Sequence, residues 1–166
     1  MINTLKTIQR IPGVHGFVGG IARYILWKQP FDDIDIIGHI DFTQLPLGSS
    51  NAIGNYEGTV SDFVYQGKNY HVSPPKQEDD IDFTRIPWQT IQGINIPTAE
   101  WLLNNISPKK SINLYQFLLS SKIYKLEDIH LLKSQSRRNE WATAWLQLTG
   151  RDDMIPYLQK LIYKKV

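Results

Sequence analysis

Residues 18–36 read VGGIARYILWKQPFDDIDI, and this stretch decides the fold. The apolar residues 14–18 before it indicate a short strand, which Gly19-Gly20 ends. Residues 21–28 predict a helix that stops at Gln29, because the residue before a proline avoids the α region. Residues 31–37 alternate acids with isoleucines, which is typical of a half-buried strand. The sequence therefore predicts a strand, a helix and a second strand in succession.

Two carboxylates in the second predicted strand are candidates for binding a metal. Side chains alternate along a strand, so Asp33 and Asp35 share one face while Ile34 and Ile36 share the other. Their Cα atoms would then lie about 6.5–7 Å apart. Carboxylates at this spacing can bridge divalent cations of the kind that serve phosphoryl or nucleotidyl displacement. The alternative is a solvated surface strand with no ligand.

The diglycine before the helix is a candidate phosphate site. Glycines allow backbone N–H groups to approach phosphate oxygens closely, and a helix N-terminus favours an anion. The segment between Gly20 and Asp33 is long enough for one helix and a returning strand, so the two features would be neighbours. The alternative is that Gly19-Gly20 is only a tight turn.

Together these residues resemble the signature of the DNA polymerase β-like nucleotidyltransferase superfamily. The match consists of Val18-Gly19-Gly20, a spacer, and the acid–apolar–acid–apolar strand at residues 33–36. Weaker similarity continues to about residue 133 and resembles small single-domain members, namely antibiotic-modifying nucleotidyltransferases and the nucleotidyltransferase-like proteins of toxin–antitoxin operons. The resemblance implies an α+β fold with a mixed β-sheet flanked by helices.

The resemblance also implies a third carboxylate on a later strand beside the first two. Asp82 is our choice, because it stands between Ile81 and Phe83 in a pattern typical of a half-buried strand over 80–86. Asp80 shares its face and is the fallback, and Asp62 ranks third. The alternative is that this acidic run is an exposed strand edge that deters aggregation.

The reaction implied by the resemblance is attack of an acceptor hydroxyl on the α-phosphorus of a nucleoside triphosphate such as ATP. Asp33, Asp35 and Asp82 would be both the catalytic residues and the ligands of two Mg²⁺ or Mn²⁺ ions. Asp82 would also lie near the acceptor hydroxyl and lower its pKa or accept its proton. The acceptor could be a small molecule, a tRNA end or a protein side chain.

Glycines and basic residues would bind the nucleotide. Gly19 and Gly20 would contact the triphosphate through their backbone, and Arg23, one turn into the helix, would add positive charge. Lys122, with Lys125 nearby, is a further candidate phosphate contact. Each of these basic residues could equally be a solvated helix side chain.

The rest of the chain supplies the organisation around this unit. We expect a loop over 44–56, a hairpin over 59–73 that turns at 66–69, and a short strand over 93–97. Amphipathic helices dominate from residue 112 onward, with Gly150 as a C-cap. Strands first and helices last favour an α+β core over residues 1–105 and a C-terminal helical segment over 106–166.

Composition excludes several other classes of protein. The 166 residues contain no cysteine, so disulfides, thiolate metal sites and cysteine nucleophiles are excluded. No apolar run is long enough to span a membrane, and the N-terminus does not resemble a signal peptide, so we expect a cytoplasmic protein. Eighteen Lys and Arg against sixteen Asp and Glu give a net charge of +2, which argues against nucleic-acid binding through bulk charge.

Two other functions compete with the enzyme. The first is a non-catalytic nucleotidyltransferase-like interaction module, an antitoxin or a regulator; the presence of both Asp33 and Asp35 argues against it. The second is a nucleic-acid-binding protein that uses the basic second half of the chain. Because the chain is short, a homodimer could complete the acceptor pocket.

Overall fold

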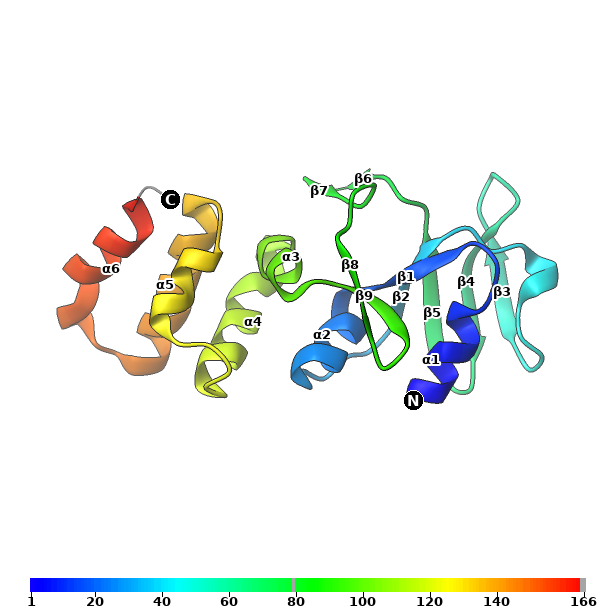
Figure 1. The fold of residues 1–166 in the computed structure, drawn as a ribbon, viewed down its shortest axis with the longest axis horizontal. Coiled ribbons are helices and arrows are strands. Elements are labelled where there is room, and N and C mark those ends of the chain that lie inside the picture. The colour runs from blue at the N-terminus through cyan, green and yellow to red at the C-terminus, as the bar shows by residue number, and fades with distance from the viewer. Residues whose placement is uncertain (79, 165–166) are drawn as a thin grey trace. The chain divides into compact units, whose positions relative to one another are not determined.

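The computed structural model describes residues 1–78 and 80–164, which form two compact units, Met1–Thr98 and Ala99–Val166 (Figure 1). All strands of the described residues belong to the first unit, and the second unit is helical. The predicted α+β class, mixed sheet and C-terminal helical segment are therefore confirmed. We predicted the division at residues 105 and 106, whereas the compact units divide between Thr98 and Ala99.

The first unit combines two helices with nine strands among its described residues. Its elements are α1 (Ile2–Gln9), β1 (Val14–Val18), α2 (Gly19–Trp27), β2 (Ile34–Gly38), the 3-10 helix Phe42–Gln44, β3 (Ser50–Gly54), β4 (Val60–Tyr65), β5 (Lys68–Ser73), β6 (Gln77–Glu78), β7 (Ile81–Asp82), β8 (Trp88–Ile91) and β9 (Ile94–Pro97).

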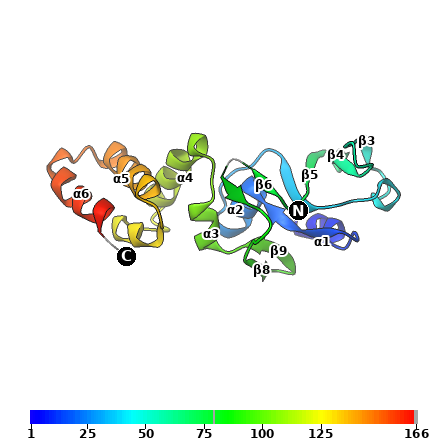
Figure 2. The same ribbon diagram turned by 90° about the horizontal axis from the view of Figure 1, so that it is seen from above.

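Five of these strands form one mixed sheet in the order β1-β2-β5-β4-β3. β2 and β5 are parallel, and the other neighbouring pairs are antiparallel. Helix α2 packs against β1 and β2, and the β8–β9 hairpin lies beside β1 in both views (Figures 1 and 2). β6 and β7 form a separate two-stranded sheet. The strand order makes β2 an interior strand of the sheet, between β1 and β5.

Alternation along the strands places one buried row of the first unit on one face of the sheet. Ile34 is the register partner of Tyr70, which in turn is the partner of Phe63, and all three are buried. The Phe63 and Tyr70 rings stack with their centroids 4.8 Å apart. Ile36, the next residue of β2 on this face, is also buried. Intervening residues of the same strands consequently point to the opposite face.

Two predicted elements differ from the structure near the carboxylate strand. β2 begins at Ile34, whereas we predicted residue 31. The reason is that Val18, the last residue of β1, already pairs with Asp35, and the chain enters α2 at the next residue. Helix α2 accordingly includes both glycines in its first turn, although we predicted its start at residue 21.

Other differences lie where the strands are short or exposed. The predicted loop over 44–56 contains β3, an edge strand whose residues are all exposed. Because β3 has no buried face, its sequence lacks the apolar alternation by which a strand is recognised. The predicted strand over 80–86 contains only β7, and the strand β8 was missed. The hairpin over 59–73 is confirmed, with its turn at Gln66 and Gly67, both at positive φ.

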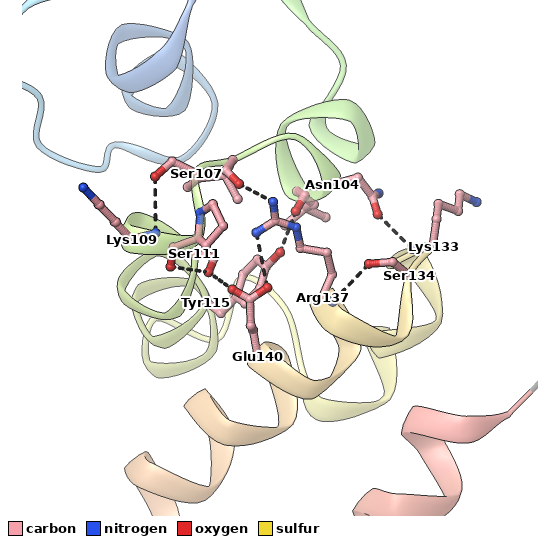
Figure 3. A network of polar contacts seen from close by, with 12 residues as sticks. Asn104, Ser107, Lys109, Ser111, Tyr115, Lys133, Ser134, Arg137 and Glu140 are labelled. Atoms are coloured by element: carbon pink, nitrogen blue, oxygen red, sulfur yellow. Dashed lines mark hydrogen bonds and ion pairs between the residues drawn. The ribbon is translucent and has the colours of Figure 1, made fainter. Parts of the chain in front are cut away.

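In the second unit, a half-buried polar network joins the helices. It contains α3 (Ala99–Asn104), α4 (Pro108–Ser120), the 3-10 helix Leu126–Leu131, α5 (Gln135–Thr149), the 3-10 helix Asp152–Met154 and α6 (Ile155–Tyr163). Arg137 and Glu140 form an ion pair at 3.2 Å, Ser111 donates to Glu140, and Arg137 donates to the Ile106 carbonyl (Figure 3). These bonds join α4 to α5. The predicted C-cap at Gly150 is confirmed by its left-handed conformation.

Within the part of the chain that the structure describes, no helix has both the length and the apolar character needed to cross a membrane.

The buried face of β2 should dominate the stability of the first unit. We expect Ile36→Ala to lower its free energy of unfolding by about 2–5 kcal/mol, because the change leaves a cavity in the core. The matched control is Ile53→Ala on the exposed edge strand β3, which should change it by less than about 0.5 kcal/mol. Denaturant titration followed by NMR signals of the first unit measures both. Equal effects of the two variants would contradict the assigned faces.

Candidate functional site

The diglycine bend lies against the carboxylate of Asp35. The antiparallel pairing of β1 with β2 places Val18 opposite Asp35, and the chain turns into α2 at Gly19. Gly19 has a φ of +67°, and a Cβ on it would lie 2.7 Å from Asp35 Oδ2. A side chain at this position would meet both unfavourable backbone geometry and the carboxylate. The bend and the acidic strand that we predicted to be neighbours are therefore in contact.

Arg23 adds a positive charge beside the same bend. A Cβ on Gly20 would lie 3.8 Å from Arg23 Nη2, so the guanidinium lies close to the second glycine. Arg23 Nε donates to Gln29 Oε1 at 2.9 Å, which holds the side chain. Burial lowers the pKa of Arg23, and the nearby charge of Asp35 partly offsets this effect. An arginine remains charged after such a shift, so the bend carries a fixed cation next to Asp35.

Asp33 has a different position from the one that we predicted. It lies in a bend immediately before β2 and is exposed, whereas Asp35 lies within the strand and is half-buried. Because Asp33 lies outside the strand, strand alternation does not determine the face to which its side chain points. The structure brings together four of the site residues predicted within 18–36, namely Gly19, Gly20, Arg23 and Asp35. Asp33 lies just before β2, the strand that carries Asp35.

We predicted that Asp82 would lie on a strand beside Asp35, but the strand that carries Asp82 belongs to another sheet. Asp82 lies on β7, which pairs only with β6 and is not part of the five-stranded sheet. Its Oδ1 accepts hydrogen bonds from the side chain and the backbone N–H of Thr84, and these bonds lower the pKa of Asp82. The fallback, Asp80, lies just before β7 at a positive φ. Asp79 of the same acidic group lies outside the described residues.

The strand that does lie beside Asp35 is β5, and it presents His71 there. Asp35 is the register partner of His71, and His71 is the register partner of Asp62 on β4. His71 Nδ1 lies 3.0 Å from Asp62 Oδ1, and Ser61 Oγ donates to Asp62 Oδ2 at 2.8 Å. Partial burial raises the pKa of Asp62, but the hydrogen bonds from His71 and Ser61 outweigh it, and the net shift is downward.

His71 was not among the residues that the sequence analysis singled out as functional. The signal was nevertheless present, because a hairpin with a two-residue turn at Gln66 and Gly67 fixes Asp62 opposite His71. What the sequence did not indicate is that β5 pairs with β2.

Lys122 belongs to the second unit, at the C-terminal end of α4. With Lys125, Trp145 and Arg151 it lines a hollow of about 920 Å³ on that unit. Its predicted contact with a nucleotide stays a prediction.

The donor set fits one cation that is shared with a nucleotide. Mg²⁺ is typically held by one or two carboxylates together with substrate phosphates. Asp35 supplies one carboxylate at the bend, and Asp33, exposed two residues earlier in the chain, is the candidate for a second. No group of three His, Asp or Glu side chains among the described residues is arranged to hold a metal ion. The predicted centre of three carboxylates and two ions therefore has no matching donor set in residues 1–78 and 80–164.

Comparison with known proteins gives one distant structural likeness. No family model and no curated protein matches the chain. The crystal structure of a protein from H. pylori, described there as a proposed nucleotidyltransferase, is similar at a TM-score of 0.44 and 13% sequence identity. The match covers 97% of this chain and 88% of that one. A likeness at this distance carries no inference about the present chain.

The contact between Gly19 and Asp35 can be tested with two glycine variants of similar backbone geometry. Gly19→Ala and Gly67→Ala both place a side chain at positive φ, which should cost about 1–2 kcal/mol of stability in each. Only Gly19→Ala also crowds a neighbour, because nothing lies within 4 Å of a Cβ on Gly67. We expect a clearly larger loss in Gly19→Ala and a shift of the Asp35 side-chain signal in NMR. An unmoved Asp35 signal in Gly19→Ala would contradict the contact.

Proposed function

We propose that this protein is a nucleotidyltransferase that moves a nucleoside monophosphate from a nucleoside triphosphate to an acceptor hydroxyl. The observation that carries the proposal is the contact of the Gly19 bend with Asp35 Oδ2, next to the Arg23 guanidinium. A helix N-terminus with two glycines binds phosphate oxygens, and a carboxylate beside it can hold the cation that accompanies a triphosphate. The resemblance of residues 18–36 to the polymerase β-like signature supports the same proposal.

Asp33 and Asp35 would hold one Mg²⁺ or Mn²⁺ ion together with the triphosphate. When bound, such an ion neutralises charge on the phosphates and polarises the phosphorus that is attacked. We do not carry the second ion into the proposal, because the strand beside Asp35 offers His71 where a third carboxylate was expected.

The remaining residues of the bend would bind and orient the triphosphate. The first N–H groups of α2 would donate to the phosphate oxygens, since no preceding residues of the helix accept their hydrogen bonds. Arg23 would hold the triphosphate by charge, and its bond to Gln29 fixes the direction of approach. The acceptor class (a small molecule, a tRNA end or a protein side chain), a second copy at the acceptor pocket, the role of Lys122 and the cytoplasmic location stay predictions.

Transfer of label from triphosphates to a panel of acceptors tests the proposal. In the presence of Mg²⁺ we expect Asp35→Asn and Asp33→Asn to lower the rate of transfer by at least about 100-fold, because each removes a carboxylate that would hold the cation on the triphosphate. The matched control is Asp32→Asn, which removes an exposed carboxylate next to the site and should retain the wild-type rate.

Three outcomes decide the matter. Metal-dependent transfer that is lost in Asp35→Asn and kept in Asp32→Asn supports the proposal. Triphosphate binding without transfer to any acceptor contradicts catalysis and favours the non-catalytic interaction module. A collapse of the melting temperature in Asp35→Asn would assign this carboxylate a structural role instead.

A further inference from the structure

One polar row crosses three strands of the sheet beside the nucleotide site. Asp35 on β2, His71 on β5 and Asp62 on β4 are register partners in succession. Neighbouring strands lie about 4.8 Å apart, and register partners point to the same face. The residues that precede them on β2 and β5, and the residue that follows on β4, form the buried Ile34–Tyr70–Phe63 row of the other face. His71 and Asp62 are therefore directed away from the core, on the face of Asp35.

The hydrogen bond between His71 and Asp62 determines which imidazole nitrogen carries the proton. Asp62 is ionised at neutral pH, because the ordinary pKa of an aspartate is about 3.9 and the pKa of Asp62 is not raised above it, and an ionised carboxylate only accepts hydrogen bonds. His71 Nδ1, 3.0 Å from Asp62 Oδ1, must then be the donor. In a neutral imidazole this leaves a lone pair on Nε2. The side chain of His71 is 52% exposed, so its ring is open to solvent on this face.

We propose that His71 is the catalytic base for the acceptor and that Asp62 is its positioning residue. This inference rests on the nucleotidyl transfer proposed above. The acceptor hydroxyl donates a hydrogen bond to His71 Nε2 and gives up its proton there. Its oxygen forms a bond to the α-phosphorus, the bond from that phosphorus to the bridging oxygen breaks, and the electron pair leaves with pyrophosphate. Asp62 holds the Nδ1–H tautomer and balances the charge of the imidazolium that forms.

The position of His71 favours the acceptor side of the reaction over the phosphate side. Gly19 and Arg23 lie at the β1 side of Asp35, where the triphosphate would bind. His71 lies at the β5 side of the same carboxylate. A group on the β5 side can contact an acceptor hydroxyl that approaches the α-phosphorus, while the bend on the β1 side still holds the triphosphate. The acceptor class is thus a compound with a free hydroxyl group, since an alcohol needs a base and a carboxylate acceptor does not.

The first test measures the tautomer of His71 in the free protein by ¹⁵N NMR, above the ordinary histidine pKa of about 6.5. We expect the Nδ1–H tautomer in the wild type and its loss in Asp62→Ala. His130 is an internal control, because its Nδ1 lies 2.8 Å from the Glu127 carbonyl and should stay protonated in every variant. A wild-type Nε2–H tautomer of His71 would overturn the proposal without any measurement of activity.

The second test separates catalysis from nucleotide binding. We expect His71→Ala and His71→Gln to lower the transfer rate by about 10²–10⁴-fold while the Kd of the metal–triphosphate complex stays at the wild-type value. Added imidazole should restore part of the rate in His71→Ala but not in Asp35→Asn. NMR spectra with wild-type dispersion confirm that each variant is folded.

The outcomes distinguish this inference from the function on which it rests. If the wild type transfers label and His71→Ala does so at the same rate, the base is another group and only this inference fails. Weaker triphosphate binding in His71→Ala, with no rescue by imidazole, would assign His71 to the nucleotide or its cation and also overturn the inference. If the wild type transfers no label to any hydroxyl acceptor, the proposed function fails and the inference fails with it.

Discussion

The pairing of β1 with β2 places Val18 opposite Asp35 and makes the chain leave the sheet at that residue pair. The turn at Gly19 leaves no room for a side chain, because a Cβ there would lie 2.7 Å from Asp35 Oδ2. Only glycine satisfies both the positive φ and this approach. The start of α2, the direction of its first N–H groups and the position of Arg23 all follow from this one contact. The candidate site is therefore a consequence of how two neighbouring strands are joined.

The same strands carry the buried Ile34–Tyr70–Phe63 row and the candidate site on opposite faces. The rings of Phe63 and Tyr70 stack on the buried face, and Asp62 and His71, one residue away on each strand, interact on the other. Functional side chains that stand on strands are held more firmly than side chains on loops. Arg23 also provides a positive charge near Asp35, and this charge stabilises the ionised carboxylate. The arrangement suits a ligand that brings both phosphates and a cation.

Local patterns allowed the helices, the hairpin and the neighbourhood of Gly19 and Asp35 to be predicted, because each depends on residues close in the chain. Pairing between distant strands could not be predicted in this way. β2 and β5 pair in parallel although β3 and β4 lie between them in the sequence. This pairing places His71, and not Asp82, beside Asp35. The acidic alternation around Asp82 indicated a face but not a partner strand. β3 was missed because an exposed edge strand has no buried face to impose a pattern.

The most direct test of the account is an NMR titration of the ¹⁵N-labelled protein with ribonucleoside triphosphates in the presence of Mg²⁺. The account predicts saturable shifts of the Gly19 and Gly20 amide signals, together with signals around Asp33 and Asp35, and no saturation in Asp35→Asn. If a triphosphate shifts no signals in the diglycine bend, or shifts them equally in Asp35→Asn, the bend and the carboxylate do not form a nucleotide site.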